Sequence, residues 1–416
     1  MSPPYTTLDN NSVREMTKLV YIANARLPTE KAHGYQICKM CEAFAHNDVS
    51  VLLLYPKRHQ IDPALGSKSV FDYYGIAPNF EVRALPNCDV VQLSPFISDR
   101  YFVPFFFVHA LLWGLYAAIV ARREKADLYY TRESSVAFWL AQMALPTVYE
   151  AHSVSNGRQR VLLQYIAQYP ALRFVVAVTS FIKGRFVERG FPAERVLVFP
   201  DGVDLRLFED LPCQKVCRQR LQLPLDRSII GYIGRFQTLG MEKGVPELIE
   251  AMAHLPSRGD KEPLLLCVGG PMDAVPAYLA LGRHLGVPMH WLRFVDRVPN
   301  WEVPYWMRAC DVTTIPFPYT EHYAYFASPL KLFEYMAAGV PIVATALPSL
   351  QDILRHGDNA WLVESIAPNV LAEGLRSVLH ATTLRSRLAR QARQDANGFS
   401  WNARASAILH SLKHLP

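Results

Sequence analysis

The sequence predicts an α/β protein with two doubly wound domains, and three observations support this fold class. The chain has 416 residues, which is too long for one ordinary hydrophobic core and suggests two domains. Short apolar segments alternate with helical segments, as in parallel sheets that are covered by helices on both faces. The alternation stops at a polar, proline-punctuated stretch near residues 205–225 and then starts again. We therefore expect two domains facing each other, with a ligand cleft between the carboxyl ends of their strands.

The expected strands are short and apolar, and a helix is expected at residues 35–46. The first series of strands covers residues 19–23, 49–55, 127–131, 146–150, 174–179 and 196–199. The second series covers residues 228–234, 263–269, 311–316 and 340–345. These series predict an N-terminal Rossmann-like domain at 1–205 and a C-terminal Rossmann-like domain at 206–390. Residues 391–416 are predicted to be a helical tail that packs back toward the N-terminal domain.

Composition and charge exclude several classes of protein. Half of the residues are hydrophobic and 19% are charged, which excludes a disordered chain. The net charge of +6 is compatible with anionic small molecules or a lipid surface but is too weak to predict nucleic-acid binding. Cys38 and Cys41 form a CxxC pair on an expected helix without a second pair at zinc spacing, so we interpret the seven cysteines as small buried side chains. The polar N-terminus lacks a secretory signal pattern, and we expect a cytoplasmic protein.

Residues 101–120, YFVPFFFVHALLWGLYAAIV, contain no Asp, Glu, Lys or Arg, and ARREK follows them. Twenty such residues are long enough to span a bilayer. However, they lie between expected strands of the first domain and contain Pro104. The alternatives are a buried helix of that domain and a helix on a membrane surface, with basic side chains near anionic lipid.

Residues 327–345, ASPLKLFEYMAAGVPIVAT, predict a short helix followed by a buried strand. The helix is expected to start at Ser328 and Pro329, with the serine hydroxyl as its cap, and to end at Gly339. A helix N-terminus attracts anions, most often phosphates. Lys331 and Glu334 share one face of this helix. These residue types suit a ligand site in which the lysine lies beside a phosphate and the glutamate accepts hydrogen bonds from ribose hydroxyls. The alternative interpretation is an ion pair on the protein surface.

A second motif, GYIGRFQTLGMEKGVPELIEAM, covers residues 231–252. Gly231 and Gly234 lie at the end of an expected strand, Arg235 follows directly, and Lys243 comes eight residues later, at the start of the next helix. Glycines at such a position allow close approach of the backbone, and two cations a loop apart can clamp the two phosphates of a nucleotide sugar. The alternative interpretation is a solvated loop with incidental charges.

In combination, these motifs resemble those of the retaining glycosyltransferases of family four, which have the GT-B fold. The resemblance rests on GYIGR and EKG in the second motif, PDGVD at 200–204, SPLKLFEYMAAGVPIVAT, FSW at 399–401, EKAHGYQICKMCEAFA at 30–45 and VYEAH at 148–152. It extends from about residue 18 to 405. It implies transfer of a sugar from a nucleotide-sugar donor to an acceptor with retained anomeric configuration. It also implies that no metal or other cofactor is bound, the nucleotide sugar being a co-substrate.

The resemblance also implies roles for individual residues. The C-terminal domain would bind the donor, with Arg235 and Lys243 on its diphosphate and Glu334 on its ribose. The N-terminal domain would bind the acceptor, with Gly34 allowing its loop to approach the phosphates and acceptor, and His152 contacting the donor sugar near the reacting carbon. The predicted catalytic residues are His152, Arg235 and Lys243, and the predicted donor-binding residues are Gly34, Gly234, Arg235, Lys243, Ser328, Lys331 and Glu334.

One position departs from the family pattern. The family has a Glu-x7-Glu motif whose second glutamate matches Glu334, but Phe326 stands where the first should be. In the family that glutamate faces the hydroxyls of the donor sugar, so the sugar contacts and the activity are in question. We expect an enzyme of polysaccharide or glycoconjugate biosynthesis that acts on a glycan or lipid-linked acceptor, in the cytoplasm or on the inner face of the membrane. The alternatives are a catalytically degenerate protein that binds a nucleotide sugar and a nucleotide-sugar epimerase.

Overall fold

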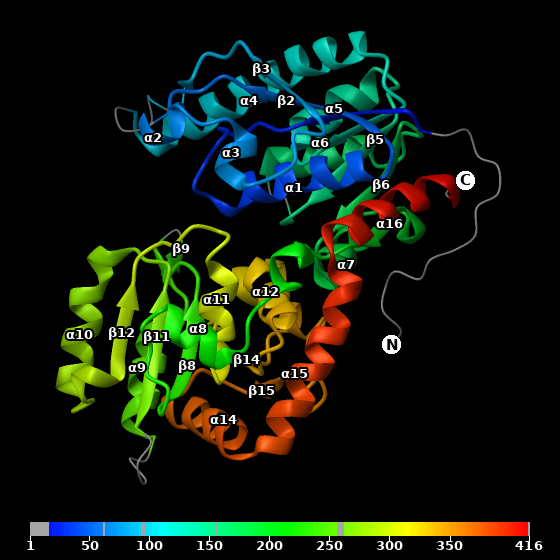
Figure 1. Ribbon diagram of the computed structural model, residues 1–416. Helices are drawn as coiled ribbons and strands as arrows, with labels where there is room; N and C mark the ends of the chain where they lie inside the picture. The colour runs from blue at the N-terminus through cyan, green and yellow to red at the C-terminus, as the bar shows by residue number, and fades with distance from the viewer. Residues whose placement is uncertain are drawn as a thin grey trace. The chain divides into compact units, whose positions relative to one another are not determined.

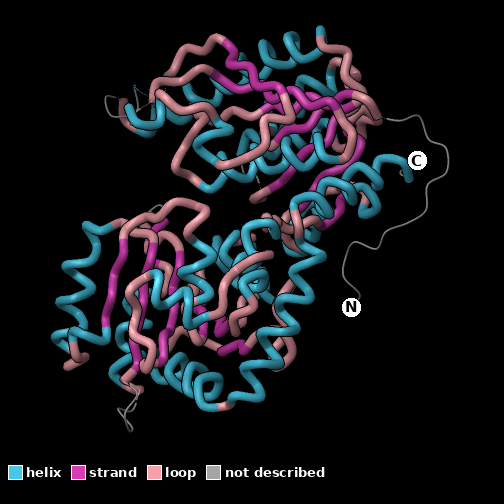
Figure 2. The backbone as a smooth tube through the Cα atoms, in the orientation of Figure 1, coloured by secondary structure: helices cyan, strands magenta, loops and turns pink. Residues whose placement is uncertain are grey.

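The computed structural model describes residues 16–60, 63–90, 92, 97–154, 157–238, 240–255 and 262–414. They form two compact units. Among the described residues, the C-terminal unit contains Asp201–Ser400, and the N-terminal unit contains residues 16–200 together with residues 401–414. In each unit a central sheet lies among helices (Figure 2). The predicted α/β fold class with two parallel-sheet domains is confirmed.

The N-terminal unit contains a seven-stranded parallel sheet with the strand order β3-β2-β1-β4-β5-β6-β7 (Figure 1). Its strands are β1 (Lys18–Ile22), β2 (Ser50–Pro56), β3 (Glu81–Leu85), β4 (Leu128–Thr131), β5 (Thr147–Ala151), β6 (Leu172–Ala177) and β7 (Val196–Val198). Its helices are α1 (Ala32–His46), α2 (Pro63–Gly66), α3 (Val70–Tyr74), α4 (Asp99–Arg123), α5 (Ser134–Gln142), α6 (Gly157–Ile166), α7 (Ser180–Glu188) and α16 (Trp401–His414).

Successive side chains of β4 point to opposite faces of the sheet, and each face is covered by its own layer of helices. Tyr129 belongs to a buried cluster with Trp113 of α4 and Val136 of α5. Tyr130, the next residue, points to the other face, where its ring centroid lies 5.3 Å from that of Phe44 in α1. Helix α16 packs against α1 and thereby joins the end of the chain to the N-terminal unit.

The C-terminal unit contains a six-stranded parallel sheet with the order β12-β11-β8-β13-β14-β15. Its strands are β8 (Ser228–Ile233), β11 (Pro263–Val268), β12 (Leu292–Val295), β13 (Val312–Ile315), β14 (Ile342–Thr345) and β15 (Trp361–Val363), with a small antiparallel hairpin of β9 (Gln237–Thr238) and β10 (Met241–Glu242). Its helices are α8 (Gln214–Arg220), α9 (Val245–Ala253), α10 (Val275–His284), α11 (Val303–Arg308), α12 (Leu330–Ala338), α13 (Pro348–Gln351), α14 (Pro368–His380) and α15 (Thr382–Ala396).

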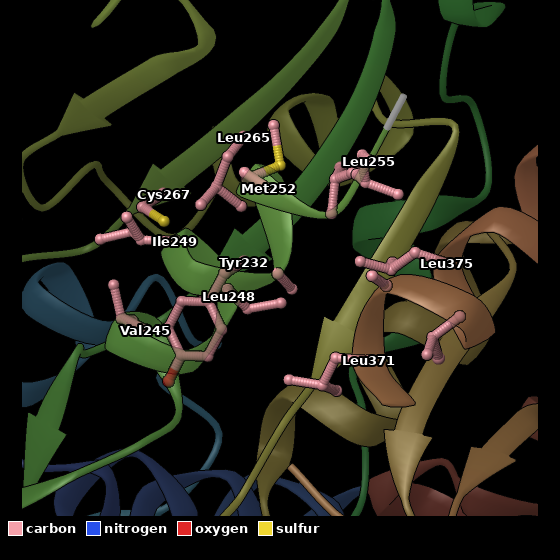
Figure 3. Packing of buried hydrophobic residues seen from close by; sticks show 14 of the residues in the cluster. Tyr232, Val245, Leu248, Ile249, Met252, Leu255, Leu265, Cys267, Leu371 and Leu375 are labelled. Carbon is pink, nitrogen blue, oxygen red and sulfur yellow. The ribbon is translucent and has the colours of Figure 1, made fainter. Parts of the chain in front are cut away.

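A core of apolar side chains fixes α9 and α14 on one face of this sheet. Leu248 and Met252 of α9 and Leu371 of α14 belong to one buried cluster with Tyr232 of β8 (Figure 3). Helix α12 attaches to the end of β8 through Tyr335, whose hydroxyl accepts a hydrogen bond from the backbone N–H of Ile233 at 2.8 Å and donates one to its carbonyl at 3.2 Å. These contacts set α12 beside the carboxyl end of β8.

The order of strands reverses between β8 and β13, because β11 lies on one side of β8 and β13 on the other. Open parallel sheets bind ligands at such a switch point, outside the carboxyl ends of the strands. The motif at residues 231–252 follows β8, and the segment that leads to α12 follows β13. The fold therefore brings both sequence motifs to the switch point of the C-terminal unit.

All ten predicted strands are present, but three further strands of the two sheets escaped prediction: β3, β12 and β15. All three lie at an edge of a sheet. Their side chains are only partly buried, as in β12, where one of four residues is buried, so the apolar pattern is weak. Edge strands need less hydrophobicity than central ones because solvent reaches one side of them.

Candidate functional site

Gly234 follows β8 directly and lets a lysine side chain approach the backbone. It has φ 138°, and its N–H donates a hydrogen bond to the carbonyl of Val268 at 2.7 Å. A Cβ atom at this position would lie 2.7 Å from Cε and 2.8 Å from Nζ of Lys331. Such distances are too short for a real contact, so the end of the lysine side chain would have to move, and the positive φ itself favours glycine.

Lys331 lies in the first turn of α12 and is buried, with 8% of its surface exposed. Its Nζ lies 3.5 Å from the centroid of the Tyr232 ring and has no hydrogen-bond partner among the described residues, Glu334 included. The expected alternative of a surface ion pair is therefore wrong. Burial and the nearby Lys243 hold the pKa of Lys331 well below its usual range, although Glu334 acts in the opposite direction. A buried lysine amino group without an acceptor indicates a site for an anion, which would favour its charged form.

Lys243 lies near Lys331 and comes from the loop that follows β8. It follows β10 and precedes Gly244, the residue before α9. Its Nζ lies 5.9 Å from the centroid of the Phe317 ring, and Nζ of Lys331 lies 5.7 Å from the same centroid. Burial and the charge of Arg235 lower the pKa of Lys243 to about 8. Three positive side chains therefore gather at the carboxyl ends of β8 and β13.

Arg235 also lines a pocket of about 430 Å³. The other walls of this pocket are the segments that follow β11 and β12, namely Gly269, Gly270, Pro271, Met272, Asp273, Asp296 and Arg297. The pocket thus lies at the carboxyl edge of the sheet and shares one cation with the lysine cluster. It contains both carboxylate and guanidinium groups, which suit a ligand rich in hydrogen-bond donors and acceptors.

Glu334 lies one turn after Lys331 on α12 and is partly buried. Burial raises its pKa to about 7, although the positive charge of Lys331 opposes the shift. A carboxyl group with this pKa is close to the midpoint of its titration at neutral pH. It can therefore accept or donate a hydrogen bond to a hydroxyl group of a ligand.

Ser328 does not have the predicted capping role. Helix α12 begins at Leu330, its N-cap is Pro329, and no side chain caps it. The hydroxyl of Ser328 instead accepts a hydrogen bond from the backbone N–H of Asp201 at 3.0 Å. Ser328 therefore ties the segment before α12 to the start of the C-terminal unit. The predicted end of the helix is confirmed, because Gly339 has the left-handed conformation, with φ 62°.

In the N-terminal unit, His152 follows β5 and is held by a buried carboxylate. Its Nε2 lies 2.5 Å from Oε1 of Glu150. Glu150 also accepts hydrogen bonds from the hydroxyl of Tyr130 and, at 3.0 Å, from Nη1 of Arg404. Burial alone would raise the pKa of Glu150, but Arg404, the hydrogen bond from His152 and the charge of that ring hold it well below its usual range. The ionised carboxylate fixes the orientation of the His152 ring.

Other polar side chains surround His152. Arg132, which follows β4, donates a hydrogen bond from Nη1 to Oε1 of Gln36 at 3.2 Å, and its Nε lies 3.9 Å from Oε1 of Glu150. Burial, Arg132 and Lys31 lower the pKa of His33 to about 4, so His33 is neutral at pH 7. The cluster lies at the carboxyl edge of this sheet, at the switch point between β1 and β4.

Two family models cover most of the chain. The model of glycosyl transferases group 1 matches residues 214–395, and the model of glycosyltransferase family 4 matches residues 37–207. The matched segments contain the lysine cluster in one case and His152 in the other. This chain belongs to the family-4 glycosyltransferases.

Relatives of this family-4 member include the D-inositol 3-phosphate glycosyltransferase of Thermobispora bispora, which is 29% identical over 293 residues. That match covers 65% of the present chain and 66% of the relative, which is just under two thirds of its length. Among solved structures, Anabaena Alr3699/HepE in complex with UDP has a TM-score of 0.69 at 20% identity, with coverage of 96% of this chain and 100% of that one. A glycosyltransferase from Rickettsia africae has a TM-score of 0.72 at 16% identity, with coverage of 97% and 99%. Both structures confirm the GT-B fold.

The structure groups the predicted site residues of this family-4 glycosyltransferase by unit. Gly234, Arg235, Lys243, Lys331 and Glu334 gather at the switch point of the C-terminal unit. Ser328 lies just before α12 in the same unit, whereas Gly34 and His152 belong to the N-terminal unit.

Gly34 lies in the first turn of α1 and not in a loop, so the predicted loop around it is wrong. A Cβ atom there would lie 2.1 Å from the hydroxyl oxygen of Tyr74 and 2.5 Å from Cγ2 of Thr29. That hydroxyl accepts a hydrogen bond from the backbone N–H of Thr29 and donates one to its carbonyl. Gly34 thus makes room for a structural tyrosine, and its role toward a ligand stays a prediction.

Sequence reasoning missed several residues of both clusters. Tyr232 and Phe317, the rings beneath the lysines, resemble ordinary core residues in the sequence. Arg404 and Glu150 are far apart in the chain, so no local pattern connects them. Arg132 could have been noticed because it directly follows an expected strand, where ligand-binding residues of parallel sheets gather.

The structure also shows the surroundings of residue 326, where the chain departs from the family motif. Phe326 is half-buried at the end of a π-helical turn, His322–Phe326. Glu321, the acidic residue just before that turn, is exposed. The segment before α12 therefore carries an aromatic side chain where the motif has a carboxylate.

Proposed function

We propose that this protein is a cytoplasmic glycosyltransferase that moves a sugar from a nucleotide-sugar donor to a glycan or lipid-linked acceptor, with retention of anomeric configuration. The observation that carries the proposal is Nζ of Lys331, which is buried without a hydrogen-bond acceptor among the described residues. Lys243 and Arg235 lie close enough to lower the pKa of their neighbours. Such a group of cations is costly unless an anion completes it. The diphosphate of a nucleotide sugar is an anion of the right charge.

The same cations can favour the chemical step. When the bond between the sugar and the diphosphate breaks, negative charge develops on the leaving phosphate oxygen. Positive groups that are already fixed at this position stabilise the transition state more than the ground state, and that difference is what accelerates a reaction. We propose that Arg235, Lys243 and Lys331 supply this positive charge without a bound metal ion.

The surroundings of the cations suit the rest of a donor. The pocket of about 430 Å³ beside Arg235 has room for a nucleoside, and we assign it to that part of the donor. We assign Glu334, with a pKa of about 7, to the ribose, from whose hydroxyls it can accept hydrogen bonds. Structures of Anabaena Alr3699/HepE hold UDP, UDP-glucose, or UDP and glucose, which makes UDP-sugars a sensible first class to test.

We assign contacts with the donor sugar and the acceptor to the N-terminal unit. His152 would contact the sugar near its reacting carbon, and its ring is held by Glu150 at 2.5 Å. A fixed ring keeps a hydrogen-bonding atom in a productive orientation without loss of entropy during the reaction. Retention of configuration requires that the acceptor approaches the face of the sugar that the diphosphate leaves.

Phe326 supports a second candidate function. Without the first glutamate of the motif, the protein could bind the nucleotide part of a donor through Lys331, Lys243 and Arg235 and yet transfer no sugar. A nucleotide-sugar epimerase is a further alternative, and it needs no acceptor. Both alternatives keep donor binding and remove transfer.

A panel of UDP-, GDP-, ADP- and dTDP-sugars would test the proposal in two steps. In a thermal-shift screen we expect one class of donor to raise the melting temperature, because a ligand that binds only the folded state stabilises it. Lys243→Ala should abolish this shift, whereas Lys215→Ala, at an exposed lysine of α8, should preserve it. If Lys243→Ala leaves both donor affinity and turnover intact, the assignment of the phosphate site is wrong.

The second step follows the products of the donor that binds. Transfer to a sugar or lipid acceptor, with the anomeric configuration determined by proton NMR, would support a retaining transferase. Binding without consumption of the donor would favour the degenerate protein, and a new nucleotide sugar in the absence of any acceptor would favour the epimerase.

A further inference from the structure

Helix α4 exposes a continuous apolar stripe. Exposed large side chains occur at Tyr101, Phe105, Val108, Leu112, Tyr116 and Ile119. Their spacings of four, three, four, four and three residues place them on one side of an α-helix. Two of them have more than 60% of their surface exposed, Tyr101 at 67% and Leu112 at 61%. With a rise of about 1.5 Å per residue, the stripe is roughly 27 Å long.

In its second half, from Trp113 onward, the other side of α4 is packed into the N-terminal unit. Trp113, Ala117 and Ala121 belong to the buried cluster between this helix and the sheet. The backbone of α4 also approaches α5 closely, since the indole N–H of Trp139 donates a hydrogen bond to the carbonyl of Leu111 at 2.9 Å. The segment Arg100–Arg123 is long and apolar enough to cross a membrane. These core contacts are incompatible with a spanning helix, because they would have to be broken on insertion.

Helix α6 lies beside α4 and carries further exposed apolar side chains. The guanidinium carbon of Arg158, in the first turn of α6, lies 5.6 Å from the centroid of the Phe107 ring of α4. Val161 and Tyr165, further along α6, are 60% and 59% exposed. We call the exposed side chains of the stripe together with these two the α4–α6 face. Only 22% of the most apolar part of α4 is buried, so this helix is not an ordinary core helix.

Positive side chains border this face. Arg122 and Arg123 end α4, Arg100 lies at its start, and Arg158 and Arg160 begin α6. All five are at least partly exposed. From Arg100 to Arg123 the helix contains no Asp or Glu, and α6 contains none either. Apolar and aromatic side chains with a border of arginines are typical of segments that lie in the headgroup region of an anionic bilayer.

We propose that the α4–α6 face binds the surface of an anionic lipid bilayer, with α4 lying parallel to the membrane plane. The stripe would enter the boundary between headgroups and acyl chains, and the arginines would contact lipid phosphates. A convex helical ridge fits a deformable lipid surface, whereas a protein partner would have to offer a matching groove. The five arginines outnumber the two acidic residues at the ends of α4, Asp99 and Glu124, and this excess favours the bilayer over a second copy of this chain, because two such borders repel each other. The inference is independent of the proposed transfer activity.

Co-sedimentation of the full chain with vesicles tests this inference without donor or acceptor. We expect binding to vesicles of phosphatidylglycerol and phosphatidylcholine, at least tenfold weaker binding to phosphatidylcholine alone, and weaker binding at high salt. Val108→Gln with Leu112→Gln should weaken binding to anionic vesicles at least tenfold. Arg122→Gln with Arg123→Gln should also weaken it but leave the residual affinity for phosphatidylcholine unchanged.

Val216→Gln serves as the matched control, because Val216 is exposed on α8 in the C-terminal unit. We expect wild-type binding for this variant. Urea unfolding midpoints within error of wild type would show that the variants are folded. The proposal is overturned if the wild-type protein stays in the supernatant with anionic vesicles. It is also overturned if the α4 variants bind as the wild type does, or if they only abolish a dimer seen by light scattering.

Discussion

Arg404 and Glu150, which are 254 positions apart in the sequence, form a buried ion pair in which Nη1 lies 3.0 Å from Oε2. Both side chains are almost fully buried, with 1% and 2% of their surface exposed. Arg404 also donates hydrogen bonds to the carbonyl groups of Pro200 and Phe199. A single side chain of α16 thus joins the C-terminal helix to the carboxylate that orients His152.

We predict that Arg404→Met destabilises the protein by about 3–5 kcal/mol, because Glu150 is then left as a buried charge without its cation. Urea unfolding at pH 7 measures the loss. Arg185→Met is the matched control, since Arg185 pairs with Glu188 on the surface and such pairs contribute about 0–1 kcal/mol. Equal effects of the two substitutions would contradict a structural role for the buried pair.

The same ion pair should make stability depend on pH in acid. The pKa of Glu150 in the folded protein lies well below its usual value. The unfolded chain therefore binds a proton first as the pH falls below about 4.3, the usual value for glutamate. The contribution of the pair is fully present above that pH and is lost as the pH falls through the folded pKa. Urea titrations from pH 6 to pH 3 should show a shallower loss for Glu150→Gln than for the wild type.

Lys331→Met should have opposite effects on stability and on ligand binding. In the absence of a ligand, we expect a gain of about 1–3 kcal/mol, because the substitution removes a buried amino group without a hydrogen-bond acceptor. Donor affinity should fall about 10- to 100-fold, which corresponds to the loss of one charge-assisted hydrogen bond. Unfolding in urea and titration calorimetry with the donor measure the two effects. A loss of both stability and affinity would show that Lys331 is an ordinary structural residue.

The wild-type pH dependence provides an independent check on Lys331. Its pKa is lower in the folded protein than in the unfolded chain, so above the folded pKa the unfolded chain binds more protons. Stability without ligand should therefore rise as the pH increases toward about 10.4, the usual value for lysine. This rise should be smaller in Lys331→Met.

Gly234→Ala should lower donor affinity through Lys331. The added methyl group would lie 2.7 Å from Cε and 2.8 Å from Nζ of that side chain, which must move away from the site. We expect affinity to fall about tenfold, together with a loss of stability of about 1 kcal/mol from the positive φ. Gly240→Ala is the control, since Gly240 also has a positive φ of 74° but faces open space. It should cost similar stability and leave donor affinity unchanged.

The central strands were predictable because their apolar pattern is strong. Parallel strands that are buried on both faces, such as Pro263–Val268, appear as continuous apolar segments. The edge strands β3 and β15 lack this signal, because their pairing comes from one neighbour and their side chains stay partly exposed. The starts of helices were also difficult to predict. Serine is a common helix cap, but the hydroxyl of Ser328 instead accepts a hydrogen bond from the backbone N–H of Asp201. That competition depends on tertiary contacts and has no sequence signature.

The candidate site was predictable as far as the chemistry is local. Arg235, Lys243 and Lys331 follow strands or begin helices, and parallel sheets bring such positions together. Their burial was not predictable, since it depends on the rings of Tyr232 and Phe317. The ion pair between Glu150 and Arg404 was also not predictable, because the sequence around one residue gives no sign of contact with the other.

Donor affinity should fall as the pH rises above about 8. Burial and the charge of Arg235 lower the pKa of Lys243 to about 8, so above that pH the site loses a positive charge. The diphosphate of a nucleotide sugar keeps its own charge over this range. Because proton binding and donor binding are linked, the dissociation constant should rise by up to about tenfold per pH unit. The rise should begin above the pKa that Lys243 has in the ligand-free protein.

Lys243→Arg isolates the contribution of this residue, because a guanidinium group stays protonated at pH 9. We expect its donor affinity to depend less on pH between 7 and 9 than that of the wild type, even if the affinity at pH 7 is lower. Lys215→Arg, at an exposed position of α8, should keep the wild-type profile. Calorimetric titrations at three pH values suffice for the comparison. Identical profiles for all three proteins would mean that Lys243 does not carry the charge that the donor needs.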